Sequence, residues 1–152
     1  MDFLIIKNEY YSLEHCYSCA VPGYLIVSPI IEVASIQNLP LRAQMDLGPT
    51  LASAVEIITD IVKPIKIYCC QYGEEDTRLH FHVFPRTEGM TASFLKEFPE
   101  QKDLIHGPLL FDWVRSKYKR SKKEVWSVVE SVVMEMKTHN KALQTDAAKP
   151  RR

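Results

Sequence analysis

Two histidines that stand two positions apart are the most specific chemical feature of this sequence. His80 and His82 lie in the stretch RLHFHVFPR, residues 78–86, where apolar residues alternate with them. Successive side chains of an extended chain point to opposite faces. Arg78 and the two histidines would then share one face, while their apolar neighbours enter the core. A row of one cation and two imidazoles on a rigid strand can receive a phosphate group or a metal ion.

The metal alternative uses the same two imidazoles. Histidines at positions i and i+2 of a strand are common metal ligands, as in cupins, whose motif adds a glutamate a few residues later. Glu88 lies nearly at that spacing. The glycine that follows in the cupin motif has no counterpart at the required spacing, however. A helix before this strand also does not suit a cupin barrel. We therefore favour the phosphate and expect no metal and no other cofactor.

Composition limits the class of protein. The chain has 152 residues, of which 46% are hydrophobic and 25% charged, and its 19 basic residues balance 19 acidic ones. This length predicts one domain, which we place at residues 1–140, with a flexible tail at 141–152. Because the net charge is zero, we expect no nucleic acid partner. No apolar run has membrane-spanning length and the N-terminus is not a secretion signal, so we expect no membrane and a cytoplasmic location.

The four cysteines raise the question of a zinc site. Cys16 and Cys19 have the spacing of zinc or redox pairs, but Cys69 and Cys70 are adjacent and would point to opposite sides of a strand. We therefore expect buried, reduced thiols rather than a four-cysteine zinc site.

Hydrophobic periodicity and turn residues give the order of elements. Strands are predicted at 3–7, 10–15, 23–30, 65–73 and 78–84. Helices are predicted at 41–62, 107–119 and 122–138, and residues 87–106 are expected to be irregular. The order β-β-β-α-β-β followed by helices predicts an α+β fold, with helices packed on a mostly antiparallel sheet. The basic residues at 115–123 are interpreted as a solvated helix end, with phosphate steering as the alternative.

The histidine stretch also resembles the motif of the histidine triad (HIT) proteins. That motif alternates three histidines with apolar residues and is often followed by Pro-Arg, as here at 85–86. Upstream, VPGYLIVSP at 21–29 is similar to a strand of that family that begins Pro-Gly-His. The resemblance covers about residues 11–87 and points to a divergent HIT-like protein. Arg78 stands where the family has its first histidine, and Tyr24 where it has the histidine after Pro-Gly.

The resemblance implies a five-stranded, mostly antiparallel sheet with one long helix packed on it. Helices at about 107–138 would be an addition to this core. It also implies a nucleotidyl hydrolase or transferase acting on an α-phosphate, a small nucleotide or phosphorylated ligand, and a homodimer. His80 takes the place of the family's nucleophile. His82 takes the place of the histidine that hydrogen-bonds the phosphate or the leaving group.

The chemistry of imidazole agrees with these roles. A neutral imidazole has an ordinary pKa of about 6.5, so it can attack at neutral pH. A backbone carbonyl on one ring nitrogen would leave the other directed at phosphorus. Water would then cleave the covalent intermediate, which divides one hard step into two easier ones. Arg78 and Arg86 are the expected sources of positive charge.

The departures from the family pattern suggest a changed binding site. Tyr24 and Arg78 replace two histidines that are neighbours in the family, which predicts a contact between the phenol and the guanidinium. Counting without gaps places three residues where the family contacts its nucleoside, and a fourth residue lies between them. These four are Glu14, Cys16, Tyr17 and His15. Purine nucleoside recognition is therefore in question.

Three acidic residues precede the histidines and bear on the ligand. Glu74, Glu75 and Asp76 would repel a polyphosphate unless they face away from it or bind a metal ion. Three hypotheses follow from the sequence. The chain is a HIT-like enzyme, a phosphate-binding module that keeps the fold without the chemistry, or a metal-dependent enzyme that uses His80 and His82.

Overall fold

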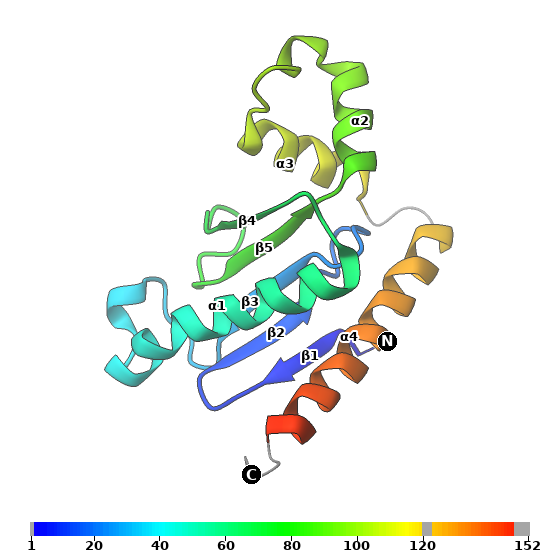
Figure 1. Cartoon of the computed structure of the whole chain (residues 1–152). Helices are drawn as coiled ribbons and strands as arrows, with labels where there is room; N and C mark the ends of the chain where they lie inside the picture. The colour runs from blue at the N-terminus through cyan, green and yellow to red at the C-terminus, as the bar shows by residue number, and fades with distance from the viewer. Residues whose placement is uncertain (1, 120–122, 148–152) are drawn as a thin grey trace.

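A five-stranded antiparallel sheet forms the centre of the computed structural model, which describes residues 2–119 and 123–147. The strand order is β1-β2-β3-β5-β4, and every neighbouring pair is antiparallel (Figure 1). The strands are β1 (Leu4–Lys7), β2 (Tyr11–His15), β3 (Leu25–Pro29), β4 (Lys66–Cys70) and β5 (Phe81–Arg86). This sheet and its helices confirm the predicted α+β class.

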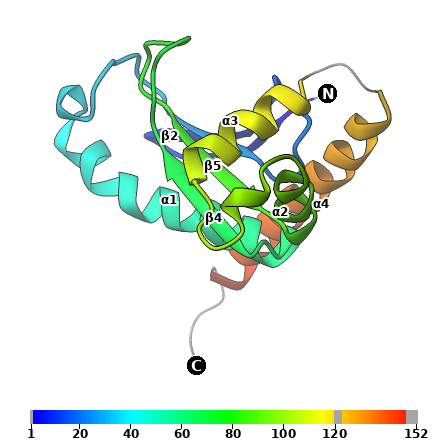
Figure 2. The ribbon, with the colours of Figure 1, turned by 90° about the horizontal axis from the view of Figure 1, so that it is seen from above.

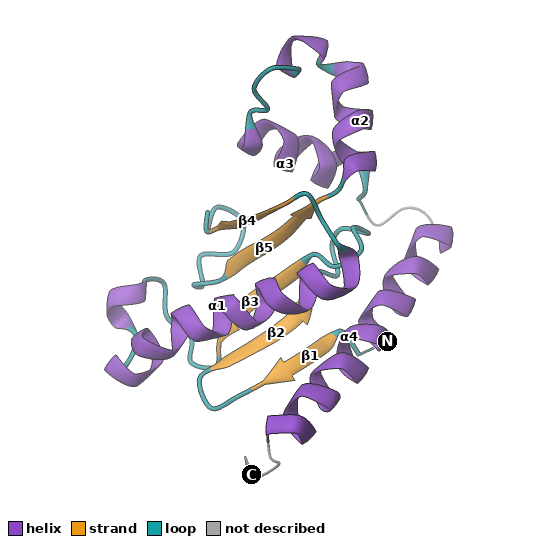
Figure 3. Ribbon diagram, viewed as in Figure 1, coloured by secondary structure: helices purple, strands orange, loops and turns teal. Residues whose placement is uncertain are grey.

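Helices cover both faces of the sheet. The long helix α1 (Leu41–Val62) packs on one face, and α4 (Lys123–Ala147) packs against α1 and β1. The helices α2 (Glu88–Glu97) and α3 (Gly107–Lys117) follow β5. Viewed from above, α1 and α3 lie on opposite sides of the sheet (Figure 2). Short 3-10 helices at Ile36–Asn38 and Pro99–Gln101 complete the helical segments of the described ranges (Figure 3).

Local sequence explains how the first elements form. Asn8 makes the turn between β1 and β2: its side-chain oxygen accepts hydrogen bonds from the amides of Tyr10 and Tyr11 at 2.9 and 2.7 Å. Helix α1 has the predicted bounds and continues through Pro49, because its buried face packs on the sheet. It ends at Lys63, which adopts a left-handed conformation with φ 51°.

The alternation predicted for the histidine stretch holds over its central part. Leu79, Phe81 and Val83 are buried in the core between the sheet and α1. The strand itself begins only at Phe81 and includes Pro85, so the predicted range 78–84 is shifted. Beyond Val83, β5 pairs with β4 alone, and a proline is tolerated where one side of a strand has no partner.

Two helical predictions need correction. Residues 87–106 are not irregular, because Thr87 caps α2 by accepting the amide of Met90 at 3.3 Å. Met90 and Phe94, four residues apart, then bury one face of this helix. Helix α4 extends to Ala147, beyond the predicted end at 138, because the segment after it contains strong helix formers such as alanine, leucine and glutamine. The predicted cap Ser121 lies outside the described residues.

Gly23 brings the turn before β3 close to the helices. Its φ is +78°, a conformation that favours glycine. A Cβ atom at this position would lie 2.4 Å from Cγ2 of Val62 and 3.4 Å from the terminal methyl of Met136. The turn therefore fits under the end of α1 and beside α4 only without a side chain.

None of the helices within residues 2–119 and 123–147 has both the length and the apolar character needed to cross a lipid bilayer.

Candidate active site

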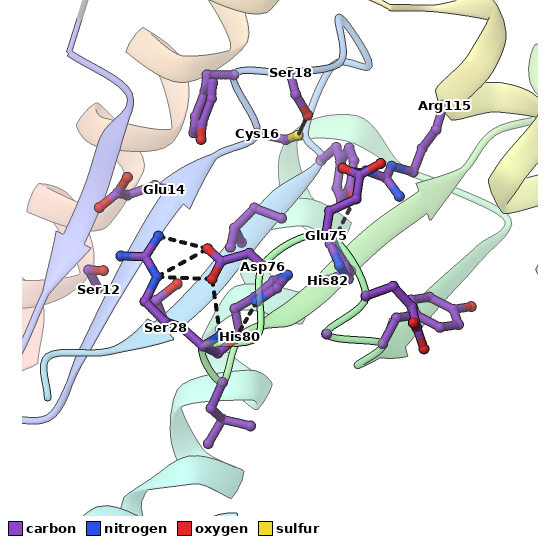
Figure 4. Close-up of a pocket in the computed structure, with 18 of the residues that line it drawn as sticks. Ser12, Glu14, Cys16, Ser18, Ser28, Glu75, Asp76, His80, His82 and Arg115 are labelled. Carbon is purple, nitrogen blue, oxygen red and sulfur yellow. Dashed lines mark hydrogen bonds and ion pairs between the residues drawn. The ribbon is translucent and has the colours of Figure 1, made fainter. Parts of the chain in front are cut away.

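A cavity of about 630 Å³ lies on the sheet face opposite α1. Its floor is made by β2, β3 and the start of β5, and its walls by the chain segment at 72–80 and by α3 (Figure 4). Cavities of this size are typical of sites for small ligands. Both predicted histidines line it.

His80 lies just before β5 and is held by the backbone. Its Nδ1 is 2.8 Å from the carbonyl oxygen of Arg78 (Figure 4). A carbonyl only accepts hydrogen bonds, so Nδ1 carries the proton and donates it. Nε2 then keeps its lone pair. This is the arrangement that nucleophilic attack by an imidazole requires.

His82 lies in β5 at the back of the cavity and is only 6% exposed. The two imidazole rings are 4.8 Å apart between centroids, and their planes meet at 79°. The ring centroids of Tyr72 and Phe111 lie farther from that of His82, at 6.0 and 5.6 Å. Burial, together with the neighbouring His80 and Arg115, lowers the pKa of His82 to about 4. His82 is therefore neutral at pH 7.

Tyr24 contacts His82 rather than the predicted Arg78. The Tyr24 hydroxyl is 2.6 Å from Nδ1 of His82, and both side chains are buried. Within the described part of the chain, this hydroxyl has no other hydrogen-bond partner, so it donates its proton to Nδ1. The proton of the neutral ring then belongs to Nε2.

Arg78 is held by carboxylates outside the strand. Its Nη2 and Nε lie 2.7 and 3.2 Å from Oδ2 of Asp76, and Oε1 of Glu32 is 3.6 Å from Nη1. Hydrogen bonds from Arg78 lower the pKa of Asp76 to about 2. The predicted row of three side chains is therefore incomplete, because Arg78 precedes β5 and bonds within its own turn.

The four residues predicted to contact the nucleoside differ in how they are placed. Glu14, Cys16 and Tyr17 all line the cavity, and Tyr17 is 62% exposed. His15 is fully buried, and both of its ring nitrogens are engaged: Nδ1 donates to the carbonyl of Cys16 at 2.9 Å and Nε2 accepts the amide of Gly23 at 3.1 Å. His15 also lines the cavity, but its ring nitrogens are both engaged by the backbone, so its substrate-binding role stays a prediction that could rest only on its carbon atoms.

Arg86 is not brought to the cavity, contrary to the sequence prediction. Its guanidinium donates to the hydroxyl of Tyr68 at 2.9 Å.

Phe84 of β5 and Phe111 of α3 pack together at 5.1 Å between ring centroids. The layer formed by α2 and α3 thus covers this end of β5, and only the histidine end stays open.

Sequence reasoning missed the contribution of α3 to the cavity. Phe111 and Arg115 line it from α3, and Figure 4 shows Arg115 extending from that helix. The only sequence feature that pointed to this helix is the basic run at 115–123. It suggests a cationic helix end but does not predict which end of the sheet the helix packs on. His106 caps α3, and His139 lies 3.1 Å from Asp60, and neither lines the cavity.

The described side chains offer no metal centre. Within the described ranges, no three histidine, cysteine or acidic side chains come close enough together to hold an ion. Glu88, the third ligand considered, begins α2 and does not line the cavity. Cys16 and Cys19 are buried free thiols as predicted, but Cys69 is exposed because β4 is an edge strand.

Comparisons with known proteins identify the fold. No family model matches the chain, and no curated protein matches its sequence. In contrast, 37 chains of solved structures match. A histidine triad protein from Sinorhizobium meliloti superposes with a TM-score of 0.61 at 18% identity, and the match covers 88% of each chain.

Two further structures give similar values. A hypothetical histidine triad nucleotide-binding protein from Sulfolobus tokodaii has a TM-score of 0.60 at 14% identity, covering 91% of this chain and 85% of that one. A Hit-like protein from Bartonella henselae, described as involved in cell-cycle regulation, has a TM-score of 0.58 at 12% identity over 91% and 86%. At these identities the similarity shows that this chain has the fold of histidine triad proteins.

Proposed function

We propose that this protein is a hydrolase or transferase acting on the α-phosphate of a nucleotide or a related phosphorylated compound through a covalent intermediate on His80. The observation that carries the proposal is the 2.8 Å contact between Nδ1 of His80 and the carbonyl of Arg78. It leaves the lone pair of Nε2 free at a cavity of suitable size.

The reaction has two steps. Nε2 of His80 attacks phosphorus, the bond from phosphorus to the leaving group breaks, and the leaving group departs with the bonding electrons and takes a proton from water. A water molecule, or the acceptor in a transferase, then attacks phosphorus and gives up a proton to the hydroxide that the first step left, while the bond from phosphorus to Nε2 breaks and the imidazole recovers its lone pair. The positive charge on the phosphorylated ring is stabilised by the Nδ1–H···O=C hydrogen bond to Arg78.

His82 holds the phosphoryl group in this scheme. Tyr24 occupies Nδ1 of His82, so the Nε2–H group can donate to a phosphate oxygen. A neutral imidazole is a hydrogen-bond donor here and not a proton donor, because the pKa of its cationic form is lowered to about 4. Preorganised donors of this kind stabilise the charge that develops in the transition state.

The rest of the ligand would lie along β2. Glu14, Cys16 and Tyr17 line that side of the cavity, and the exposed ring of Tyr17 offers a surface for an aromatic base or another flat group. None of these residue types selects a purine nucleoside by itself. The proposal therefore extends to phosphorylated compounds other than nucleotides.

A phosphorus-linked adduct on His80 tests the proposal. The protein is incubated with adenosine 5′-phosphate derivatives that carry phosphoanhydride or phosphoramidate leaving groups, and intact mass and peptide mass spectra are recorded. We expect an adenylyl group on His80 in the wild type and none in His80→Ala. Full turnover by His80→Ala would rule the mechanism out.

A binding module without turnover is the second candidate. It is favoured by Arg78, whose charge is engaged by Asp76 and Glu32 and is less available to a transition state. In that case AMP would stabilise the protein against heat while no compound modified His80. A ligand at one hundred times its dissociation constant adds about 2.7 kcal/mol of apparent stability, which a thermal shift assay detects.

A further inference from the structure

Arg115 is the cation of α3 that faces the cavity. Its guanidinium lies 5.5 Å from the ring centroid of Phe111, and its side chain is 30% exposed. Figure 4 shows the side chain extending from α3 toward Glu75 and the region of His82. Its charge contributes to the lowered pKa of His82, after burial and His80. Arg115 therefore stands beside the same imidazole that would hold the phosphoryl group.

The ion pair that Arg115 makes is easily exchanged. Its partner is Glu75, whose side chain is 92% exposed, and the nearest N···O distance is 3.9 Å. Exposed pairs at such distances contribute little free energy. Arg78, by contrast, makes several contacts with Asp76 at 2.7 to 3.2 Å and also faces Glu32. Of these two arginines, only Arg115 is thus held weakly enough to exchange its partner for a ligand.

The charge balance of the cavity limits what that ligand can be. Arg78 and Arg115 are the permanent cations that line it within the described residues. Six carboxylates line it as well: Glu14, Glu32, Glu74, Glu75, Asp76 and Asp112. Each further phosphate of a polyphosphate would meet these carboxylates, and the described lining residues hold no third cation to offset the repulsion.

We propose that Arg115 is a substrate-binding residue that leaves Glu75 to bind the phosphoryl group beside His82, and that the cavity accepts ligands with one phosphoryl group in preference to polyphosphates. This inference rests on the proposed function, because it places the phosphorus atom in front of His80. A guanidinium suits this role since it can donate two parallel hydrogen bonds to phosphate oxygens.

Calorimetric titration with AMP and with inorganic phosphate tests the role of Arg115. We expect Arg115→Gln to bind both ligands more weakly, with each dissociation constant raised about tenfold or more. This is the usual effect of losing hydrogen bonds to a charged group. Lys117→Gln is the matched control: Lys117 lies on the same helix but pairs with Glu97 at 2.7 Å outside the cavity. It should bind as the wild type does. Equal binding by Arg115→Gln and wild type, or no binding of either probe by wild type, overturns the proposal.

Glu75→Gln provides a test that does not depend on the folding of the arginine variant, because Glu75 is exposed. If Arg115 exchanges Glu75 for the ligand, this variant should bind AMP about threefold more tightly than the wild type. Unchanged or weaker binding contradicts the exchange. Wild-type protein should also bind AMP more tightly than ATP in the absence of divalent cations, and the reverse order contradicts the preference for one phosphoryl group.

The adduct on His80 separates this inference from the proposed function. AMP binding that depends on Arg115 without any adduct would support the inference and contradict the enzyme. An adduct that forms at the wild-type rate in Arg115→Gln would support the enzyme and overturn the inference.

Discussion

The hydroxyl of Tyr24 lies 2.6 Å from Nδ1 of His82, so a tyrosine just before β3 fixes the orientation of a histidine of β5. The two side chains come from paired segments, in which Leu25 is opposite Val83. Both are buried, and burial raises the pKa of Tyr24, which keeps the phenol protonated as a donor. In the proposed mechanism, Tyr24 is therefore a positioning residue that acts through His82.

Tyr24→Phe should lower turnover while the protein stays folded. Without the hydroxyl, the proton of His82 can occupy either nitrogen, and the donor toward the phosphate is no longer fixed. We expect kcat to fall about tenfold or more. Tyr11→Phe is the control, because it removes another buried hydroxyl, which donates to the carbonyl of Ala43 at 2.7 Å away from the cavity. That variant should lose stability and keep its kcat; equal losses of kcat in both would contradict the positioning role.

The two histidines should differ in how much turnover depends on them. His80→Ala removes the nucleophile and should leave only background activity. His82→Ala removes a hydrogen-bond donor, for which a loss of about 100- to 1000-fold is typical. Steady-state rates measured on the substrate that labels His80 give both values. A larger loss of turnover in His82→Ala than in His80→Ala would contradict the assignment of His80 as the nucleophile and His82 as the hydrogen-bond donor.

Stability should decrease as the pH falls from 7 to 5. Burial lowers the pKa of His15 to about 4, and burial with neighbouring charge does the same for His82. Between the unfolded value of about 6.5 and these folded values, the unfolded chain binds more protons than the folded one, so protonation favours unfolding. Each histidine should contribute a loss on the order of 2 kcal/mol at pH 5.

Urea unfolding at pH 7 and pH 5 measures this dependence. Replacing His15 by glutamine should reduce the difference between the two free energies of unfolding, because the titrating group is gone. His106 is a suitable control, since it caps α3 from an exposed position. An unchanged pH dependence in His15→Gln would show that His15 does not stay neutral in the folded protein.

Gly23→Ala should destabilise the protein strongly. The left-handed φ alone costs about 1–2 kcal/mol, and the new methyl would clash with Val62. Gly89→Ala is the matched substitution: Gly89 lies in α2, and nothing is within 4 Å of the position that its new methyl would take. It should leave stability unchanged or raise it by up to about 1 kcal/mol. Similar melting temperatures for the two variants would contradict the close approach at Gly23.

The sequence predicted the sheet and the histidine pair because both depend on local patterns. Alternation in residues 79–83 places apolar side chains on one face and the histidines on the other, and this holds whatever packs against the strand. The helix at 41–62 was predicted with its observed bounds, since Pro64 and the apolar spacing define it.

The remaining features depend on contacts between distant segments. The pairing of Arg78 with Asp76 competes with the predicted contact to Tyr24, and only the turn geometry decides between them. The cavity wall depends on where α3 packs, which no residue of the basic run at 115–123 encodes by itself. His15 is the clearest case: its position suggested a ligand contact, but the tertiary structure satisfies both nitrogens with backbone groups.

The two histidines of the cavity and the wall above them come from separate parts of the chain. His80 and His82 belong to the sheet and the turn that leads into it, whereas Phe111 and Arg115 belong to a helix that enters after the sheet is complete. Substitutions in α3 that keep the packing of Phe111 on His82 can therefore change which molecules are admitted while His80 stays held by the carbonyl of Arg78. In the proposed function, ligand selectivity and the nucleophile thus rest on different segments, and engineering a new selectivity would begin with α3.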